Sequence, residues 1–193
     1  MVALARLRSN LVLTLVGVAV FGAAFGFLAL REGGSPHGGA AHITPRGLLD
    51  DQQLRLGEPA PDFALVSVRD EGELIRLSEL RGKAVVVNFY ASWCGPCRQE
   101  LPAFEKVSRE LSSDVAFIAV NVQESRADAV GILDSTGVTF PAVLDEDGSV
   151  AQRYGLRGMP STFLLDADGI VRKFGSGAID AETLRTELLA IIK

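Results

Sequence analysis

The feature that most constrains the fold is an almost unbroken apolar run that ends shortly before a pair of cysteines. Residues 84–90 read Ala-Val-Val-Val-Asn-Phe-Tyr. A run of this length and composition is typical of a strand buried on both faces, inside a sheet that helices cover. Residues 115–122 form a second run of the same kind. Together they predict an α/β domain built around a central sheet.

The flanking patterns supply the other elements of this domain. Residues 96–111, about 125–135 and 181–192 have helical periodicity, with Ser125 and Asp180 placed to cap the second and third helices. Residues 63–68 and 73–76 predict one strand pair, and residues 162–166 and 170–174 predict a hairpin across Ala-Asp-Gly. We therefore expect one domain over residues 57–193, with a mixed sheet whose central strands are parallel and helices on both faces. The apolar stripe expected on the last helix is Leu184, Leu188, Leu189 and Ile192.

A second apolar feature lies near the start of the chain. Residues 11–30 contain no charged side chain and span about 30 Å as a helix, which matches the core of a bilayer. Arg6 and Arg8 precede this segment, so residues 1–10 are expected in the cytoplasm and the rest of the chain outside it. We interpret residues 11–30 as an uncleaved signal anchor and residues 31–56, whose first half is rich in Gly, Ala and Pro, as a flexible linker. A cleaved signal peptide is the alternative, and it gives the same extracytoplasmic location.

Charge and composition exclude several functions. The first 31 residues carry three basic and no acidic side chains, so the remaining chain has 16 basic and 24 acidic residues and a net charge of −8. Such a body is poorly suited to bind nucleic acid, because that affinity comes mainly from neutralising phosphates. A structural zinc site normally needs four ligands. With two cysteines, and with His37 and His42 far upstream in a Gly-rich stretch, we expect no metal.

The two cysteines carry the predicted chemistry. Cys94 and Cys97 lie three residues apart where a strand gives way to a helix, so their side chains share one face and can close a disulfide. The unpaired amides and dipole of a helix N-terminus favour a thiolate at Cys94, which would act as the nucleophile. Cys97, one turn deeper, would resolve the mixed disulfide. An inert disulfide is the alternative, but so short a loop would stabilise the fold very little.

At this point the residues resemble a known family. Residues 88–97, Asn-Phe-Tyr-Ala-Ser-Trp-Cys-Gly-Pro-Cys, are similar to the active site of the thioredoxin superfamily. Residues 56–63, 120–125 with 140–145, and 158–162 resemble the ResA/TlpA-like membrane-anchored branch of that superfamily. The resemblance implies a thioredoxin-like fold, a cis peptide bond before Pro160, and a loop that faces Cys94. Met159 and Pro160 would then contact an extended substrate, while Trp93 shields the cysteine pair and offers a contact surface.

The resemblance also implies a proton-transfer residue. Glu100 matches a carboxylate that the branch carries three residues after the second cysteine, and in a helix this spacing places it on the face of Cys97. A partly buried carboxyl could exchange a proton with Cys97. The alternative is a solvated helix charge. Cytosolic thioredoxins have a buried Asp where this chain has Asn88, and Asn cannot accept the proton, so that role would fall to Glu100, another group or water.

The function that this resemblance implies is thiol–disulfide exchange at the outer face of the membrane. The chain would reduce disulfides in partner proteins, such as apocytochrome c during cytochrome c maturation, and a thiol-electron donor in the membrane would recharge it. The Cys94–Cys97 dithiol itself would carry the electrons, without a cofactor. The alternatives are a disulfide oxidase or isomerase with a higher potential, a redoxin-type thiol peroxidase and a metal chaperone. The sequence leaves the substrate, the donor and the oligomeric state open.

Overall fold

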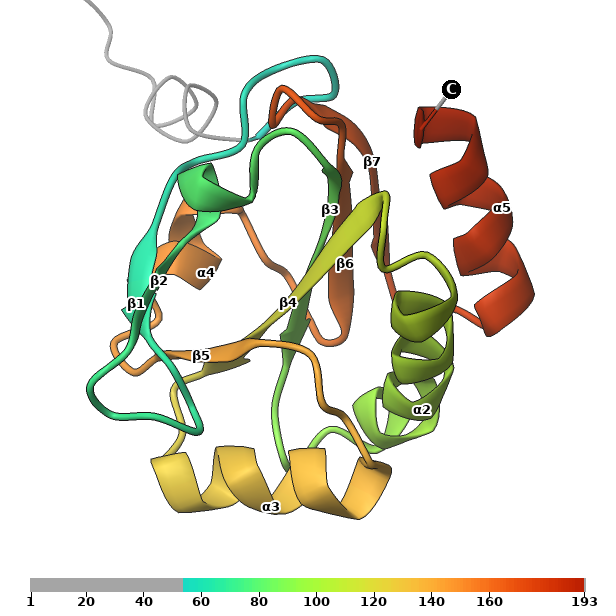
Figure 1. Cartoon of the computed structure of the whole chain (residues 1–193). Coiled ribbons are helices and arrows are strands. Elements are labelled where there is room, and N and C mark those ends of the chain that lie inside the picture. The colour runs from blue at the N-terminus through green and yellow to red at the C-terminus, as the bar shows by residue number, and fades with distance from the viewer. Residues whose placement is uncertain (1–53, 193) are drawn as a thin grey trace, which may run out of the picture. The chain divides into compact units, whose positions relative to one another are not determined.

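The computed structural model describes residues 54–192 of the chain, and their main feature is a five-stranded mixed sheet. Its strand order is β5-β4-β3-β6-β7 (Figure 1). β3 pairs parallel with β4, and β4 pairs parallel with β5, whereas β6 and β7 add antiparallel to the other side. The mixed sheet with parallel central strands is therefore confirmed. The strands are β3 (Ala84–Tyr90), β4 (Val115–Val122), β5 (Ala142–Asp145), β6 (Ser161–Leu165) and β7 (Val171–Ser176).

The central strand β3 is buried along its whole length, as its composition predicts. Because side chains alternate across a strand, Val86 and Tyr90 contribute to one core layer while Val87 and Phe89 contribute to the other. The first layer also contains buried side chains of the three longest helices, and the second contains those of α4 and η1 together with Phe63. The helices are η1 (Leu77–Leu80), α2 (Gly95–Glu110), α3 (Arg126–Thr136), α4 (Ser149–Arg153) and α5 (Ala181–Ile192).

Helix ends follow the capping signals in the sequence. The Ser125 hydroxyl accepts a hydrogen bond from the Asp128 amide at 3.2 Å and starts α3. Gly137, in the left-handed conformation at φ 72°, ends the same helix. Asp180 accepts from the Thr183 amide at 2.9 Å at the start of α5. These caps explain why the predicted bounds of α3 and α5 lie close to the observed ones.

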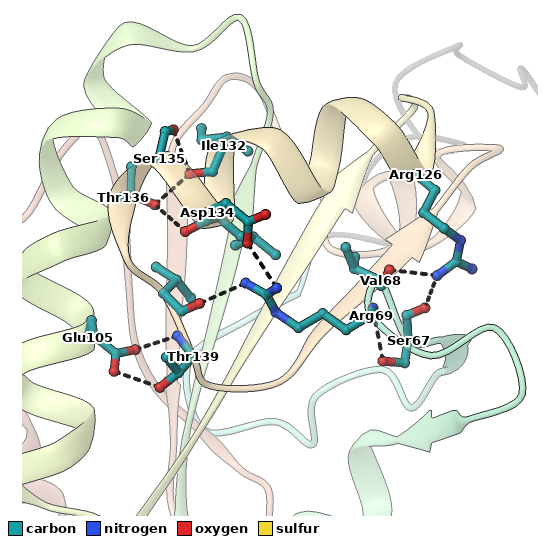
Figure 2. A network of polar contacts seen from close by, with 12 residues as sticks. Ser67, Val68, Arg69, Glu105, Arg126, Ile132, Asp134, Ser135, Thr136 and Thr139 are labelled. Atoms are coloured by element: carbon teal, nitrogen blue, oxygen red, sulfur yellow. Dashed lines mark hydrogen bonds and ion pairs between the residues drawn. The ribbon is translucent and has the colours of Figure 1, made fainter.

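The N-terminal strand pair forms a separate two-stranded sheet. β1 (Ala64–Val66) and β2 (Leu74–Arg76) pair antiparallel, and Ser67 links them to the main sheet through a bridge to Val143. Figure 2 shows two arginines that fix this sheet to α3: the Arg69 guanidinium donates to Asp134 at 2.9 Å, and that of Arg126 donates to the carbonyl of Val68 at 2.6 Å.

Two short elements between α3 and β6 are absent from the sequence prediction. These are the four-residue strand β5 and the five-residue helix α4, both too short to show a period. Asp145, which is fully buried, joins them: its carboxylate accepts hydrogen bonds from the amides of Val150 at 3.1 Å and Ala151 at 2.8 Å. The first turn of α4 is thereby fixed to the end of β5.

The predicted apolar stripe of α5 is wrong at two positions. Leu184 and Leu188 are fully buried, but Leu189 is 45% exposed and Ile192 is 36% exposed. Ala181 and Ile191 are partly buried in the core layer instead. The buried face follows a 3.6-residue period from Ala181, and Leu189 is rotated by about 100° from Leu188 out of that face.

The Asp145 contacts give a stability prediction. Asp145→Ala leaves two buried amides without an acceptor and should lower the free energy of unfolding by about 2–4 kcal/mol. Asp145→Asn keeps one acceptor oxygen and should lose about half as much. Urea unfolding of the oxidised protein, followed by circular dichroism, measures both. A loss below about 0.5 kcal/mol for Asp145→Ala, the scale of a neutral surface change, would contradict this account.

Candidate active site

Cys94 and Cys97 form a disulfide at the start of α2. Cys94 is the N-cap residue of the helix, and its Sγ accepts a hydrogen bond from the Cys97 amide at 3.2 Å. Pro96 occupies the first turn, where its missing amide proton costs little. Cys94 is 3% exposed and Cys97 is fully buried. The predicted pairing is therefore present, and the Cys94 sulfur occupies the position where helix amides favour a negative charge.

The predicted contact residues differ in how far they are exposed. Trp93 is 70% exposed, so it presents a broad apolar surface directly before Cys94. The Met159–Pro160 peptide bond is cis, as the resemblance implies. Met159 is half-buried and packs against the core layer that contains both cysteines, while Pro160 is buried.

An open groove of about 450 Å³ brings Trp93 and Met159 together. Its walls come from the end of β4, from the turn after β5, from α4 and from the loop before β6. The groove therefore begins at the residue before Cys94 and runs over the segment that the sequence prediction left without structure. The lining residues are Trp93, Val122, Gln123, Asp147, Gly148, Ala151, Gln152, Leu156, Gly158 and Met159.

Glu100 lies three residues after Cys97 on α2 and is buried, with 2% of its surface exposed. One carboxylate oxygen accepts a hydrogen bond from Asn88 Nδ2 at 2.8 Å, and the other accepts from the Ile179 amide at 3.2 Å. Burial raises the pKa of Glu100 to about 7, although these two hydrogen bonds lower it in part. The alternative of a solvated helix charge is therefore wrong. A carboxyl with a pKa near neutrality can both take and give a proton under working conditions.

Asn88 has a structural role in the site that the sequence did not indicate. Its Nδ2 donates to Glu100 and also to Thr162 Oγ1 at 3.0 Å, so it links β3, α2 and β6. The sequence showed that Asn88 cannot accept a proton. The structure adds that the Asn88 side-chain amide is hydrogen-bonded to Glu100, the carboxyl that can accept the proton.

Glu124 is a site residue that sequence reasoning missed. Its carboxylate accepts hydrogen bonds from the amide of Ser92 at 2.7 Å and from Asn121 Nδ2 at 2.8 Å. The Arg98 guanidinium donates to the Ser92 carbonyl at 2.9 Å. The loop that carries Trp93 into Cys94 is thereby held from two sides. Parallel pairing of β3 with β4 places the residues after both strands at one edge of the sheet. The prediction of two parallel strands was therefore the signal that could have placed Glu124 near Ser92.

Comparisons with known proteins agree with this geometry. The model of the Redoxin family matches residues 55–188. The chain is 37% identical to the thiol-disulfide oxidoreductase ResA of Bacillus subtilis (strain 168), over 74% of this chain and 78% of that protein. It is 34% identical to the thiol:disulfide interchange protein DsbE of Xylella fastidiosa (strain 9a5c), over 74% and 72%. A crystal structure of a thiol:disulfide interchange protein of the thioredoxin family from Chlorobium tepidum TLS superposes with a TM-score of 0.65 at 25% identity, over 72% of this chain and 99% of that one.

The chain belongs to the Redoxin family. Within this family it is a thiol–disulfide oxidoreductase of the ResA/DsbE type, with a thioredoxin-like fold. Proteins of this type carry electrons on a cysteine pair, which is Cys94–Cys97 in this redoxin.

Two further observations concern the described part of the redoxin. Among residues 54–192, no three or more His, Cys, Asp or Glu side chains lie together so that they could hold a metal ion. No helix in that range is long and apolar enough to cross a membrane. The predicted anchor at residues 11–30, and His37 and His42, lie outside the described residues.

Glu100 should make stability depend on pH in the oxidised redoxin. Its pKa is about 7 when folded, against 4.5 for the free side chain, so the folded state binds more protons between these values. The free energy of unfolding should therefore fall by about 3 kcal/mol as pH rises from about 4.5 to above 7. Glu100→Gln should remove this component. Urea unfolding of the wild type and of Glu100→Gln across this range gives the difference between their free energies of unfolding. This difference should change with pH, and a constant difference would contradict the assignment.

A matched comparison is Glu105, which lies five residues after Glu100 on α2. Burial acts to raise the pKa of Glu105, but hydrogen bonds from Thr139 and from Arg109 together hold it below its usual value. The stability that the Glu105 carboxylate contributes is lost as pH falls through its folded pKa. The Glu105 carboxylate thus adds a component to the free energy of unfolding that rises with pH in the acidic range. Glu105→Gln should remove this component, whose sign is opposite to that of Glu100.

Proposed function

We propose that this redoxin is a membrane-anchored reductase that acts on disulfides of partner proteins outside the cytoplasm, apocytochrome c among them. The observation that carries the proposal is the hydrogen bond from the Cys97 amide to Cys94 Sγ. After reduction, the same amide and the dipole of α2 stabilise a thiolate at Cys94, which is the reactive form in thiol–disulfide exchange.

The exchange proceeds in two displacements. The Cys94 thiolate attacks one sulfur of the substrate disulfide, the substrate S–S bond breaks, and a mixed disulfide forms while one substrate thiolate leaves. Cys97 then loses its proton, attacks Cys94 Sγ and forms the Cys94–Cys97 bond, which releases the second substrate thiolate. Two electrons pass from the dithiol to the substrate. The released thiolates take up protons according to their own pKa.

Glu100 is the proposed acceptor of the Cys97 proton. It follows Cys97 by three residues on α2, so the two side chains share one helix face. Its pKa of about 7 lets the carboxylate accept a proton during reduction of the substrate and return it when the pair is recharged. Asn88 and the Ile179 amide hold the carboxylate in place for both steps.

Substrate contacts are proposed for the residues around the groove. Trp93 would cover the disulfide-bearing segment of the partner, and the backbone of Met159, before the cis bond to Pro160, would pair with it as an extended strand. Trp93 and Met159 both line the groove, and Trp93 directly precedes Cys94, so a substrate bound in the groove would have its disulfide near the nucleophile.

The proposed location rests on the sequence before the described domain. The uncharged residues 11–30 follow Arg6 and Arg8, which keeps residues 1–10 in the cytoplasm, and residues 31–56 tether the domain of residues 57–193 outside. Thiols tend to be oxidised in that compartment. Because the two cysteines form a single redox pair, the electrons have to come from another protein, which we propose is a thiol-electron donor in the membrane.

A trapping experiment tests the substrate and the location together. In the full-length chain, Cys97→Ala should accumulate mixed disulfides through Cys94, because the second displacement is lost. The adducts should disappear on reduction, include a haem-free c-type cytochrome, and be absent from the Cys94→Ala/Cys97→Ala control. Treating intact cells beforehand with a membrane-impermeant maleimide should prevent them. Failure of Cys97→Ala to capture any protein contradicts the reductase assignment, and adducts that survive the maleimide contradict the location.

The reduction potential separates a reductase from an oxidase or isomerase. A strongly reducing Cys-Gly-Pro-Cys pair should have a potential near −270 mV, whereas a dedicated oxidant lies near about −120 mV. Equilibration of the full-length redoxin with glutathione or dithiothreitol buffers, followed by thiol alkylation, gives the value. A potential above about −180 mV, the range of a disulfide isomerase, would overturn the proposed direction.

A further inference from the structure

Gln123 has an unusual backbone conformation. Its φ is 54°, and among residues 54–192 it is the one non-glycine residue with a positive φ. Left-handed backbone is unfavourable for a residue with a long side chain, and glycine is the residue that adopts it without steric cost. Gln123 follows the last residue of β4, in a tight turn that glycine would fit better. A glutamine at such a position motivates the hypothesis that its side chain has a use there.

The Gln123 side chain occupies a space that Gly148 leaves open. A Cβ atom at Gly148 would lie 2.8 Å from Gln123 Cδ and 2.9 Å from its Nε2, closer than real contacts allow. Gly148 is itself left-handed, with φ 72°, and is the N-cap of α4. Two left-handed positions on different segments thus meet around one carboxamide.

This carboxamide contributes little to the fold itself. Gln123 is exposed, and its Nε2 reaches the carbonyl of Asp147 at 3.4 Å, near the outer limit of a hydrogen bond. The turn is held instead by its backbone, because the Gln123 amide donates to the Asp145 carbonyl at 3.0 Å. The side chain is therefore not required to close the turn.

Gln123 instead lines the groove next to the reacting disulfide. Gln123, Gly148, Trp93 and Met159 all border the same open space, and Trp93 directly precedes Cys94. A mixed disulfide at Cys94 places the flanking residues of the substrate at this groove. A carboxamide can both donate and accept a hydrogen bond, which suits the alternating N–H and C=O groups of an extended polypeptide.

We propose that Gln123 is a specificity residue whose carboxamide binds the main chain of the substrate segment next to the disulfide. The inference rests on the proposed function, since it requires a polypeptide held at Cys94. It assigns to Gln123 the preference for a polypeptide disulfide over a small disulfide that lacks peptide groups and cannot extend along the groove.

The test compares two substrates in the reduced full-length redoxin. Second-order rate constants are measured for a disulfide-linked peptide of about ten residues per chain, long enough to span several residues on each side of the bond, and for 2-hydroxyethyl disulfide. Gln123→Ala and Gln123→Gly should each lower the ratio of peptide to small-disulfide rate constants about 3- to 10-fold, the loss of one hydrogen bond. Gln99→Ala, a matched change at an exposed glutamine on α2 outside the groove, should leave the ratio unchanged.

Folding is controlled by the glycine variant. Gln123→Gly removes the side chain and also relieves the left-handed backbone, so its Tm in the oxidised state should stay within about 3 °C of the wild type. An unchanged ratio in both variants overturns the inference. So does an equal fall of both rate constants, which would mean that the turn acts on Cys94 through Glu124 and Ser92. A wild-type redoxin that reacts with neither disulfide overturns the proposed function itself, and this inference with it.

Discussion

The hydrogen bond from the Cys97 amide to Cys94 Sγ is the interaction around which the rest of the site is arranged. It exists because a buried strand ends and a helix begins within four residues, so the cysteine becomes the cap of that helix. The position of this cap depends on the loop before Cys94. Ser92 in that loop donates its amide to Glu124 and accepts a hydrogen bond at its carbonyl from Arg98. The fully buried β3 anchors this loop to the centre of the sheet.

Helix α2 also shows how burial alone does not decide the charge of a carboxyl. Glu100 and Glu105 are both buried on this helix, yet the pKa of Glu100 is raised and that of Glu105 is lowered. Glu105 receives two hydrogen bonds from Thr139 and a charged partner in Arg109, which together outweigh its desolvation. Glu100 receives one hydrogen bond from the side-chain amide of Asn88 and one from the backbone amide of Ile179. No cation among residues 54–192 contributes to its pKa, so desolvation dominates. The carboxyl beside the cysteines is therefore the one whose charge can change near neutral pH.

Much of this site was predictable from the sequence because its signals are local. The apolar runs of β3 and β4, the capping residues of α3 and α5, and the spacing of Cys94, Cys97 and Glu100 each fall within a few residues. What the sequence did not provide depends on contacts between distant segments. The strand β5 and the helix α4 have no period, and their junction depends on Asp145 reaching backbone amides five and six residues later. Glu124 acquires its role by meeting Ser92, 32 positions earlier in the chain.

The parallel part of the sheet explains why these distant segments meet at the cysteines. β3, β4 and β5 run in the same direction, so the residues that follow each of them reach one edge of the sheet. The segment after β3 supplies Trp93 and Cys94, the segment after β4 supplies Gln123 and Glu124, and the segment after β5 supplies the wall at Asp147 and Gly148. The strand β5 thus lengthens the edge of the sheet at which the nucleophile lies, and α4 follows it there. The segment after β3 thus carries the nucleophile, while the segments after β4 and β5 form walls of the groove beside it.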